Sequence, residues 1–289
     1  NFEGKSIPNL LRGPLDIAEL EEQRQTIYEY RKQRVPLHRD DKILTSWNAL
    51  MVAALCQLYR VTGKEKWLQA AEKAWHFVME KLYDGSALYV STRNGKWSGK
   101  GFLDDYAYGI YALLALYGAT YKEEYQEMAE QFCEKAVQDF HDSEKQGFFL
   151  YGRENEELIF RPKETYDGAL SSGNSAMAYN LVQLAFLTGE KRYEEWAENQ
   201  LAFMSGVAEG YPAGYAMFLI ALSDYFHGPE KITVAVRERK EIQSLPLRVP
   251  LDALVRVVQG DTKEYPLKND RTTYYVCRGH VCMPPENEL

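Results

Sequence analysis

The sequence predicts a mainly helical protein: a stack of antiparallel helical hairpins of the α/α-toroid type, incomplete in this chain, with a small C-terminal α/β appendage. Two observations predict this class. Apolar residues recur at spacings of three and four through most of the first 228 residues, which is the period of an amphipathic helix. One joint also occurs three times, at 58–64, 116–122 and 185–191, where a helix, a very short turn and a second helix follow one another. Such short turns make the paired helices antiparallel neighbours.

The periodicity predicts eight helices, over residues 16–34, 46–60, 64–82, 104–120, 123–140, 173–188, 191–204 and 212–226. Long segments separate the hairpins from one another. Residues 87–97 alternate in polarity around Asn94-Gly95, which predicts a β-hairpin. Residues 147–153 with 158–160 are predicted to form a second one. Short turns therefore lie at one end of the stack and long loops at the other.

The long loops share their end of the stack with the N-termini of the inner helices, because all inner helices of such a toroid run in the same direction. We call this end the mouth. Loops on a rigid scaffold carry function. The mouth is therefore the predicted ligand-binding end.

From about Lys231 the pattern changes to short strands, predicted over 232–236, 255–258 and 273–276, with a short helix over 250–253. We therefore expect two domains, a helical-hairpin region over 1–228 and a small α/β appendage over 229–289.

Charge and composition exclude several classes of protein. A net charge of −8 argues against nucleic-acid binding, which needs clustered positive charge. No run of about 18 apolar residues is present, so we expect no membrane-spanning helix. The N-terminus lacks the basic and apolar pattern of a signal peptide. With only four cysteines, a reducing cytoplasm fits the chain best.

Four polar segments lie where inner helices are predicted to begin: 38–48, 104–106, 171–175 and 211–215. Glycosidic cleavage uses two carboxyl groups, one to protonate the leaving oxygen and one to activate water or attack. We take Asp41 and Asp105 as this pair, Asp40 and Asp104 as alternatives, and His38 as an auxiliary acid, base or ligand contact. The candidates for ligand binding are Arg39, Trp47, Asn48, Tyr106, Ser172, Asn174 and Tyr211.

The same residues have structural interpretations. Asp, Ser and Asn cap helix N-termini, and capping is favoured over function for Asp104 and Ser172 taken singly. Residues 39–42 can equally form an ion-pair network. Core packing is favoured over sugar stacking for Trp47.

Cys277 and Cys282 flank an Arg-Gly-His-Val segment. Two thiols and one imidazole fall short of the four ligands of a structural zinc site, and no second pair lies nearby in the sequence. We therefore predict a reduced pair of thiols without metal. No cofactor is expected.

Several segments together resemble the YyaL / spermatogenesis-associated protein 20 family. They are residues 37–50 (LHRDDKILTSWNAL), 102–107 (FLDDYA) and 172–175 (SGNS), and residues 277–282 followed by Pro284 are similar to the family's C-terminal signature. The resemblance covers nearly the whole chain.

The resemblance implies a thioredoxin-like domain joined to a six-hairpin, glycosidase-like toroid. This chain has no Cys-x-x-Cys motif and about four hairpins, so we expect it to resemble the C-terminal portion of such a protein, with the thioredoxin-like domain missing from this chain. Two functions are open. The first is a toroid that binds or processes carbohydrate by acid/base hydrolysis or epimerisation. The second is a non-catalytic recognition module coupled to the thioredoxin-like domain.

Overall fold

The computed structural model describes residues 3–4, 20–155, 159–228, 230–243, 245–278 and 281–289. The chain divides into two compact units, residues 1–41 and 42–289. The first unit contains α1 (Glu21–Lys32), which has no buried residue. Its predicted start at residue 16 lies outside the described residues. The predicted boundary at 228/229 stays a prediction, since the hairpins and the C-terminal sheet fall in the same unit.

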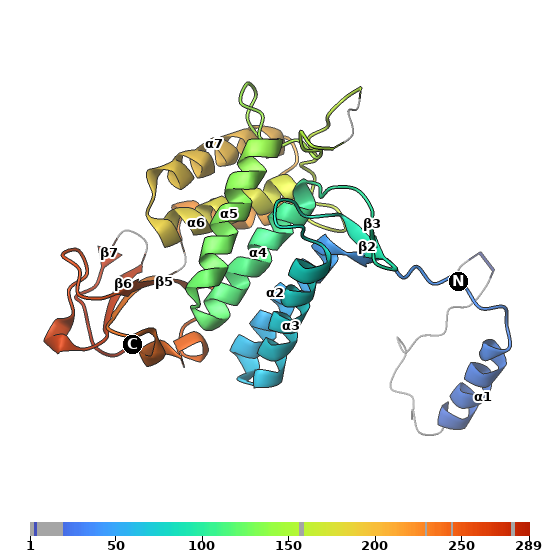
Figure 1. Cartoon of the computed structure of the whole chain (residues 1–289), viewed down its shortest axis with the longest axis horizontal. Coiled ribbons are helices and arrows are strands. Elements are labelled where there is room, and N and C mark those ends of the chain that lie inside the picture. Colours follow the sequence, from blue (N-terminus) through green and yellow to red (C-terminus); the bar gives the residue numbers. More distant parts are fainter. Residues whose placement is uncertain (1–2, 5–19, 156–158, 229, 244, 279–280) are drawn as a thin grey trace. The chain divides into compact units, whose positions relative to one another are not determined.

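Three antiparallel helical hairpins and one further helix form the body of the second unit (Figure 1). Each hairpin pairs one inner helix with one outer helix, and α2 packs on α4, α4 on α6 and α6 on α8. The helices are α2 (Thr45–Thr62), α3 (Glu65–Lys81), α4 (Leu103–Thr120), α5 (Glu123–Phe140), α6 (Gly173–Thr188), α7 (Lys191–Ala208) and α8 (Ala216–Phe226). The prediction of a mainly helical, toroid-type stack is confirmed.

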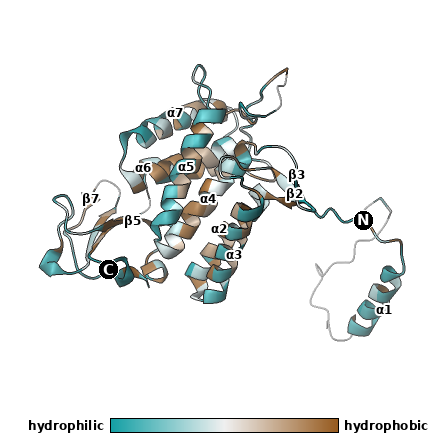
Figure 2. Ribbon diagram, in the orientation of Figure 1, coloured by the Kyte–Doolittle hydropathy of each residue, from teal (hydrophilic) through white to brown (hydrophobic). Residues whose placement is uncertain are grey.

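The hydrophobic core lies between the inner and outer layers. Figure 2 shows apolar residues concentrated on α4 and α6, which are buried along most of their length. At the ends of the inner layer, α2 exposes Met51 and Val61, and α8 exposes Ile220 and Phe226. The inner layer is thus an arc whose two end helices keep an apolar face in solvent.

The three repeated joints end their inner helices in the same way. Gly63, Tyr121 and Gly189 follow α2, α4 and α6 in the left-handed conformation, and each donates its amide to a carbonyl of the last helical turn. This is the usual way to end a helix and reverse the chain in few residues. The sequence repeat is therefore a repeat of a helix-ending turn.

One of the two predicted β-hairpins forms. Strands β2 (Ser91–Arg93) and β3 (Lys96–Trp97) pair across Asn94 and Gly95, both with positive φ, and β1 (Ile43–Leu44) pairs with β2. The hairpin predicted for 147–153 and 158–160 is wrong over its described residues. Phe148 instead bridges to His141 at the end of α5, because the chain folds back on the preceding helix.

The C-terminal segment forms a four-stranded sheet in the order β5-β4-β6-β7. Its strands are β4 (Lys231–Val236), β5 (Leu254–Gln259), β6 (Thr273–Arg278) and β7 (Val281–Cys282), with β4 and β5 parallel. The part of the chain that the structure describes also contains four short 3-10 helices: η2 (Pro212–Gly214), η3 (Arg239–Ile242), η4 (Leu245–Leu247) and η5 (Lys268–Asp270). The helix predicted over 250–253 is wrong. Those residues form a turn closed by the Ala253 amide and the Pro250 carbonyl.

The sheet packs on the short-turn end of the helices, opposite the mouth. Arginines of the sheet region bind the carbonyls there: Arg239 donates to Tyr121 O and Arg256 to Thr188 O. Positive charge at helix C-termini is favourable because the dipole and the free carbonyls are negative there. The appendage therefore closes this end and leaves the mouth to the loops.

Candidate functional site

A buried carboxylate joins the starts of α2 and α4. Asp105 Oδ1 accepts a hydrogen bond from the Ser46 amide (3.1 Å), and Oδ2 accepts one from the Phe102 amide (2.9 Å). Only 2% of Asp105 is exposed. Its pKa is raised to about 7, mainly by burial and less by the nearby charge of Asp104, against the lowering effect of the two amides. Both oxygens of Asp105 are thus committed to helix N-termini.

Asp167 joins α6 and α8 by the same device. Its Oδ1 accepts from the Ser172 amide (2.9 Å) and its Oδ2 from the Met217 amide (2.8 Å). The sequence prediction missed this residue, which lies in the loop five residues before the N-cap of α6. The sequence did contain a signal for Asp167, because an acidic residue shortly before a predicted helix start is a candidate for binding the free amides of that helix. Asp105 and Asp167 therefore each hold the starts of two neighbouring inner helices together.

Asp104 lies in the first turn of α4, close to the start of α6. Unlike Asp105 and Asp167, it has an oxygen without a hydrogen-bond partner among the described residues. Its Oδ1 is buried, and no described residue hydrogen-bonds to it. A Cβ built on Gly173 would lie 2.5 Å from this oxygen, so α6 approaches Asp104 closely only because residue 173 is glycine. The pKa of Asp104 is raised to about 6, first by burial and then by the charge of Glu164, while the Gly173 amide lowers it. Such a carboxyl group exchanges its proton near neutral pH.

Two tyrosines lie close to these acids along the chain, Tyr108 after Asp104 and Tyr166 before Asp167. Tyr108, one turn beyond Asp104, is buried and donates its hydroxyl to the Ser171 carbonyl. Tyr166 is exposed and meets the ring of Tyr215 edge to face, with ring centroids 6.1 Å apart. Exposed aromatic faces are suited to stacking on the apolar faces of flat or ring-shaped ligands.

Two predicted aromatic ligand contacts are exposed. Trp47 is 61% exposed and Tyr211 59%. The core packing favoured for Trp47 from sequence is wrong, because α2 is an end helix of the arc and one of its faces is not covered. Contact of either ring with a ligand stays a prediction.

Tyr106 and Asn174 are placed in the interior instead. The Tyr106 ring packs against Phe132 and Phe140, and its hydroxyl accepts from the Leu88 amide (3.1 Å). The amide group of Asn174 is fully buried and bonds to main-chain groups, which holds the 147–151 loop to α6. Their predicted ligand contacts remain untested, but both side chains already have internal partners.

Ser172 and Asn48 have local roles at helix starts. Ser172 is the N-cap of α6 and accepts from the Ser175 amide (3.1 Å), so the capping interpretation is confirmed for it. Asn48 Nδ2 donates to Leu44 O (2.7 Å) and the residue remains partly exposed. Ligand binding by either residue stays a prediction.

The segment from His38 to Asp41 belongs to the first unit, and its residues His38, Arg39, Asp40 and Asp41 are exposed. The proposed pairing of Asp41 with Asp105 spans the two units and stays a prediction. Across the described residues, no group of three or more His, Cys, Asp or Glu side chains has the arrangement of a metal site. Within the same residues, no helix is both long and apolar enough to span a membrane.

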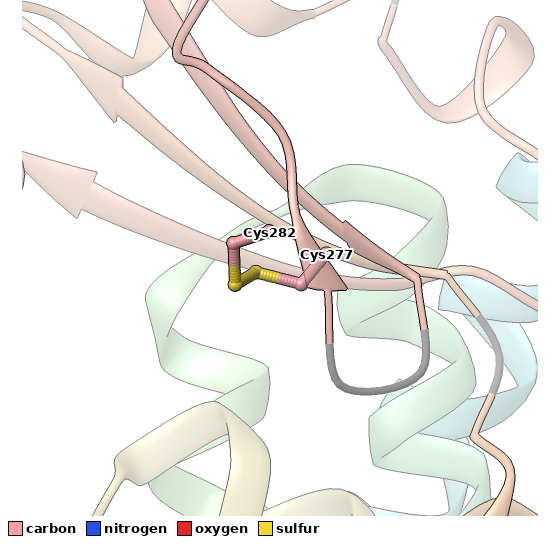
Figure 3. The surroundings of a disulfide bond; sticks show 2 residues. All are labelled: Cys277 and Cys282. Atoms are coloured by element: carbon pink, nitrogen blue, oxygen red, sulfur yellow. A yellow bond between two sulfur atoms is a disulfide. The ribbon is translucent and has the colours of Figure 1, made fainter.

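The prediction of a reduced Cys277/Cys282 pair is wrong. The two residues lie directly opposite each other on β6 and β7 and form a disulfide (Figure 3). The sequence predicts a strand only as far as residue 276, but the chain returns as an antiparallel strand, which brings residues five positions apart into register. Disulfides are rare in a reducing cytoplasm, so the predicted cytoplasmic location stays a prediction that this bond does not favour.

Thiol titration of the unfolded protein without reductant is expected to find two free thiols, those of Cys56 and Cys133. After reduction all four cysteines should react. Mass-spectrometric mapping of the alkylated residues identifies which thiols were free. Four reactive thiols before reduction would show that the hairpin bond is not formed in solution.

The fold and the acids at the inner-helix starts define this chain as an arc of an α/α-toroid protein. Its sequence further shows that it is a distant homologue of spermatogenesis-associated protein 20. It is 30% identical to the rat protein, over 90% of this chain and 36% of that protein, and 26% identical to the human one, over 90% and 37%. An uncharacterised protein of Caenorhabditis elegans is 26% identical over 94% of this chain and 40% of its own length. The chain thus spans little more than a third of these relatives. No protein-family model matches it.

Solved structures similar to this chain include two carbohydrate-active enzymes. Cellobiose 2-epimerase from Bacillus thermoamylovorans matches with a TM-score of 0.49 and 19% identity, covering 64% of this chain and 54% of that chain. A family 76 glycoside hydrolase (mannosidase) from Bacteroides thetaiotaomicron matches with a TM-score of 0.49 and 16% identity, covering 57% and 44%.

Proposed function

We propose that the mouth binds a carbohydrate and that Asp104 transfers a proton to or from it. The observation that carries this proposal is the half-buried Asp104 carboxyl group, which has an unpaired oxygen and a pKa near 6. Helix capping accounts for Asp105 and Asp167, whose oxygens all accept main-chain amides. On Asp104 the Gly173 amide acts less strongly than burial, which raises the pKa of this carboxyl group. An acid/base group works best when its pKa is near the operating pH.

The chemistry follows from the protonation state of Asp104. The protonated carboxyl group donates its proton to the glycosidic oxygen as the bond to the sugar breaks. In an epimerisation the carboxylate instead removes the proton from the carbon beside the carbonyl group of the open-chain sugar, and a proton is returned to the opposite face of the resulting enediol. Hydrolysis needs a second carboxylate to activate water or to attack. Glu164 is the described candidate, because it is exposed and close enough to raise the pKa of Asp104. Asp41 and Asp40 remain the predicted candidates from the first unit, and His38 remains the predicted auxiliary acid, base or ligand contact.

Sugar recognition at the mouth would come from aromatic rings. Tyr166 and Tyr211 present exposed rings beside the start of α8, and Trp47 presents one at the start of α2. A pyranose ring has an apolar face that stacks on such rings, while its hydroxyls bind polar groups. Such rings supply the stacking faces that a carbohydrate site uses.

The test is a sugar screen followed by a comparison of variants. The 289-residue chain is titrated with mono- and disaccharides, and bound sugars are then assayed for hydrolysis or epimerisation. Asp104→Asn is expected to lower turnover by a factor of about 10²–10⁴, and turnover of the unaltered protein should depend on a group that titrates near pH 6. Glu127→Gln, on the exposed face of α5, is the matched control and should change neither. Absence of saturable sugar binding, or full turnover in Asp104→Asn, contradicts the proposal.

A non-catalytic recognition module is the second candidate function. The observation that favours it is the commitment of Asp105 and Asp167 to helix amides, which makes two mouth acids structural. In this case the complete protein should retain its partners in a pull-down when Asp104 is changed to Asn, with no sugar turnover in either form. Loss of partners from Asp104→Asn at unchanged stability counts against a purely structural role of the acids.

A further inference from the structure

An open surface pocket lies in the long segment between α5 and α6, next to the C-terminal end of α5. The side chains of Phe149, Arg153, Arg161 and Lys163 are part of its lining. It holds about 670 Å³, which is room for a charged group carried on a larger molecule. The charges and hydrogen bonds of this lining indicate which group that is.

One main-chain carbonyl positions both arginines. Asp139 O, in the last turn of α5, accepts hydrogen bonds from the Arg153 amide and from Arg161 Nη2, both at 3.2 Å. Arg161 Nε also donates to Tyr151 O (3.0 Å), and its guanidinium group lies 4.2 Å from the centroid of the Phe149 ring. The guanidinium group of Arg161 is therefore fixed in place.

Capping of α5 explains the position of Arg161 but does not use all of its donors. Positive charge is favourable at a helix C-terminus, where the free carbonyls lie. Arg161 Nη1, however, has no partner among the described residues. It is not one of the buried unpaired atoms either, so this group is open to solvent.

Arg153 adds a second guanidinium group to the pocket. Its side chain is exposed and makes no hydrogen bond or ion pair with any residue that the structure describes. Burial lowers the pKa of Arg161, and the charge of Arg153 lowers it further, while the charge of Asp142 opposes both. The two guanidinium groups are therefore close enough to repel each other.

The acids around these arginines are already paired with lysines. Asp142 binds Lys163 at 2.7 Å, and this ammonium group holds the pKa of Asp142 at about 2. Glu154 and Asp139 both bind Lys135, at 2.8 and 2.9 Å. None of these three carboxylates therefore forms an ion pair with Arg153 or Arg161.

Two positive charges remain unmatched in the pocket. Glu144 and Lys145 are exposed neighbours whose formal charges cancel, which leaves the charges of Arg153 and Arg161. An anion bound between like charges removes their repulsion. Guanidinium groups match the oxygens of phosphate in paired hydrogen bonds, and a phosphate monoester carries a charge of about −1.5 to −2 at pH 7. Its charge therefore balances that of the two arginines.

We propose that this pocket binds the phosphate group of a small phosphorylated molecule, with Arg153 and Arg161 Nη1 as its donors. A long polyanion such as nucleic acid is disfavoured, because the whole chain has a net charge of −8. The proposal does not rest on the carbohydrate chemistry proposed for Asp104.

The experiment follows the Arg161 Nε–H signal by NMR in the 289-residue chain. This N–H group donates to Tyr151 O, and such a bond slows its exchange with water, so the signal is observable. Inorganic phosphate and glycerol 3-phosphate should each shift it saturably. Acetate carries a single negative charge and should bind more weakly than either.

The variants are compared by calorimetric titration with inorganic phosphate. Arg153→Gln should weaken the affinity about ten- to hundredfold, the size of a hydrogen bond to a charged group. Arg161→Lys keeps the charge but loses the paired donors, and it should also weaken binding. Arg271→Gln is the matched control, because it removes an exposed arginine outside the pocket, and it should leave the affinity unchanged.

A loss of affinity in Arg153→Gln but not in Arg271→Gln, with native circular dichroism in both, supports the site. Equal affinity in the two variants and the unaltered protein overturns it, because phosphate then binds elsewhere. Equal losses in both variants overturn it as well, since binding would then follow net charge alone. The absence of a saturable Arg161 signal shift with either phosphate, or equal affinity for acetate and phosphate, also contradicts the proposal. Arg153→Gln decides the matter even if Arg161→Lys does not fold. Asp104→Asn tests the mouth separately, so failure of one site does not imply failure of the other.

Discussion

Replacing Asp105 with alanine is expected to lower the free energy of unfolding by about 3 kcal/mol. The carboxylate accepts the amides of Ser46 and Phe102, which start two neighbouring inner helices. Removal of one capping acceptor costs about 0.5–2 kcal/mol, and here two buried amides lose their partner at once. Urea denaturation followed by circular dichroism measures the loss. Glu127→Gln, at an exposed position, should stay within about 0.5 kcal/mol of the unaltered protein.

The cost of Asp105→Ala should also depend on pH. The pKa of Asp105 is about 7 in the folded protein and about 3.9 in an unfolded chain. Between these values the folded protein binds more protons than the unfolded one, so the stability contributed by this group falls as the pH rises. The stability of Asp105→Ala does not fall with pH in this way, because the variant has no carboxyl group there. The difference in free energy of unfolding between the unaltered protein and the variant should therefore be largest near pH 4 and smaller above pH 7. An equal difference at both ends would show that Asp105 is already ionised at low pH in the folded protein.

The helical hairpins were predictable from sequence because their signals are local. Apolar spacing marked the helix bodies, and the left-handed residues Gly63 and Gly189 marked two of the three ends. The loop after α5 was not predictable in the same way. Phe148 has the character of a strand residue, but its partner is His141, and nothing in the local pattern says that the chain pairs with the end of the preceding helix.

For the site, the sequence predicted which segments lie near one another but not which side chain in each segment has a free oxygen. Acids and small polar residues at the helix starts indicated the mouth, but Asp104 and Asp105 are neighbours that differ by about 100° around α4. One faces the start of α6 and the other faces α2, and this difference decides which of them keeps a buried, unpaired oxygen. Asp167 was missed because its role depends on α8, whose start lies 50 residues further along the chain.

Gly173→Ala should be destabilising although alanine is the better helix former. Alanine gains about 1 kcal/mol over glycine inside a helix. At position 173, however, the new Cβ would lie 2.5 Å from Asp104 Oδ1 and 2.9 Å from the Leu103 side chain. Overpacking of this kind costs about 1–3 kcal/mol. Gly206→Ala in α7 is the matched control, because its Cβ would meet nothing within 4 Å, and it should stabilise the protein.

The same substitution connects packing to the proposed chemistry. If the starts of α4 and α6 are forced apart, water reaches the Asp104 carboxyl group and removes the burial that raises its pKa. Carboxyl-carbon NMR of Gly173→Ala should therefore show the pKa of Asp104 falling from about 6 towards its ordinary value, while Gly206→Ala leaves it unchanged. In the Gly173→Ala background, Asp104→Ala should recover part of the lost stability, because it removes one of the two clashes, whereas the clash with Leu103 remains. If Gly173→Ala stabilises the protein as much as Gly206→Ala does, the starts of α4 and α6 are not in close contact. The burial that raises the pKa of Asp104 would then be absent.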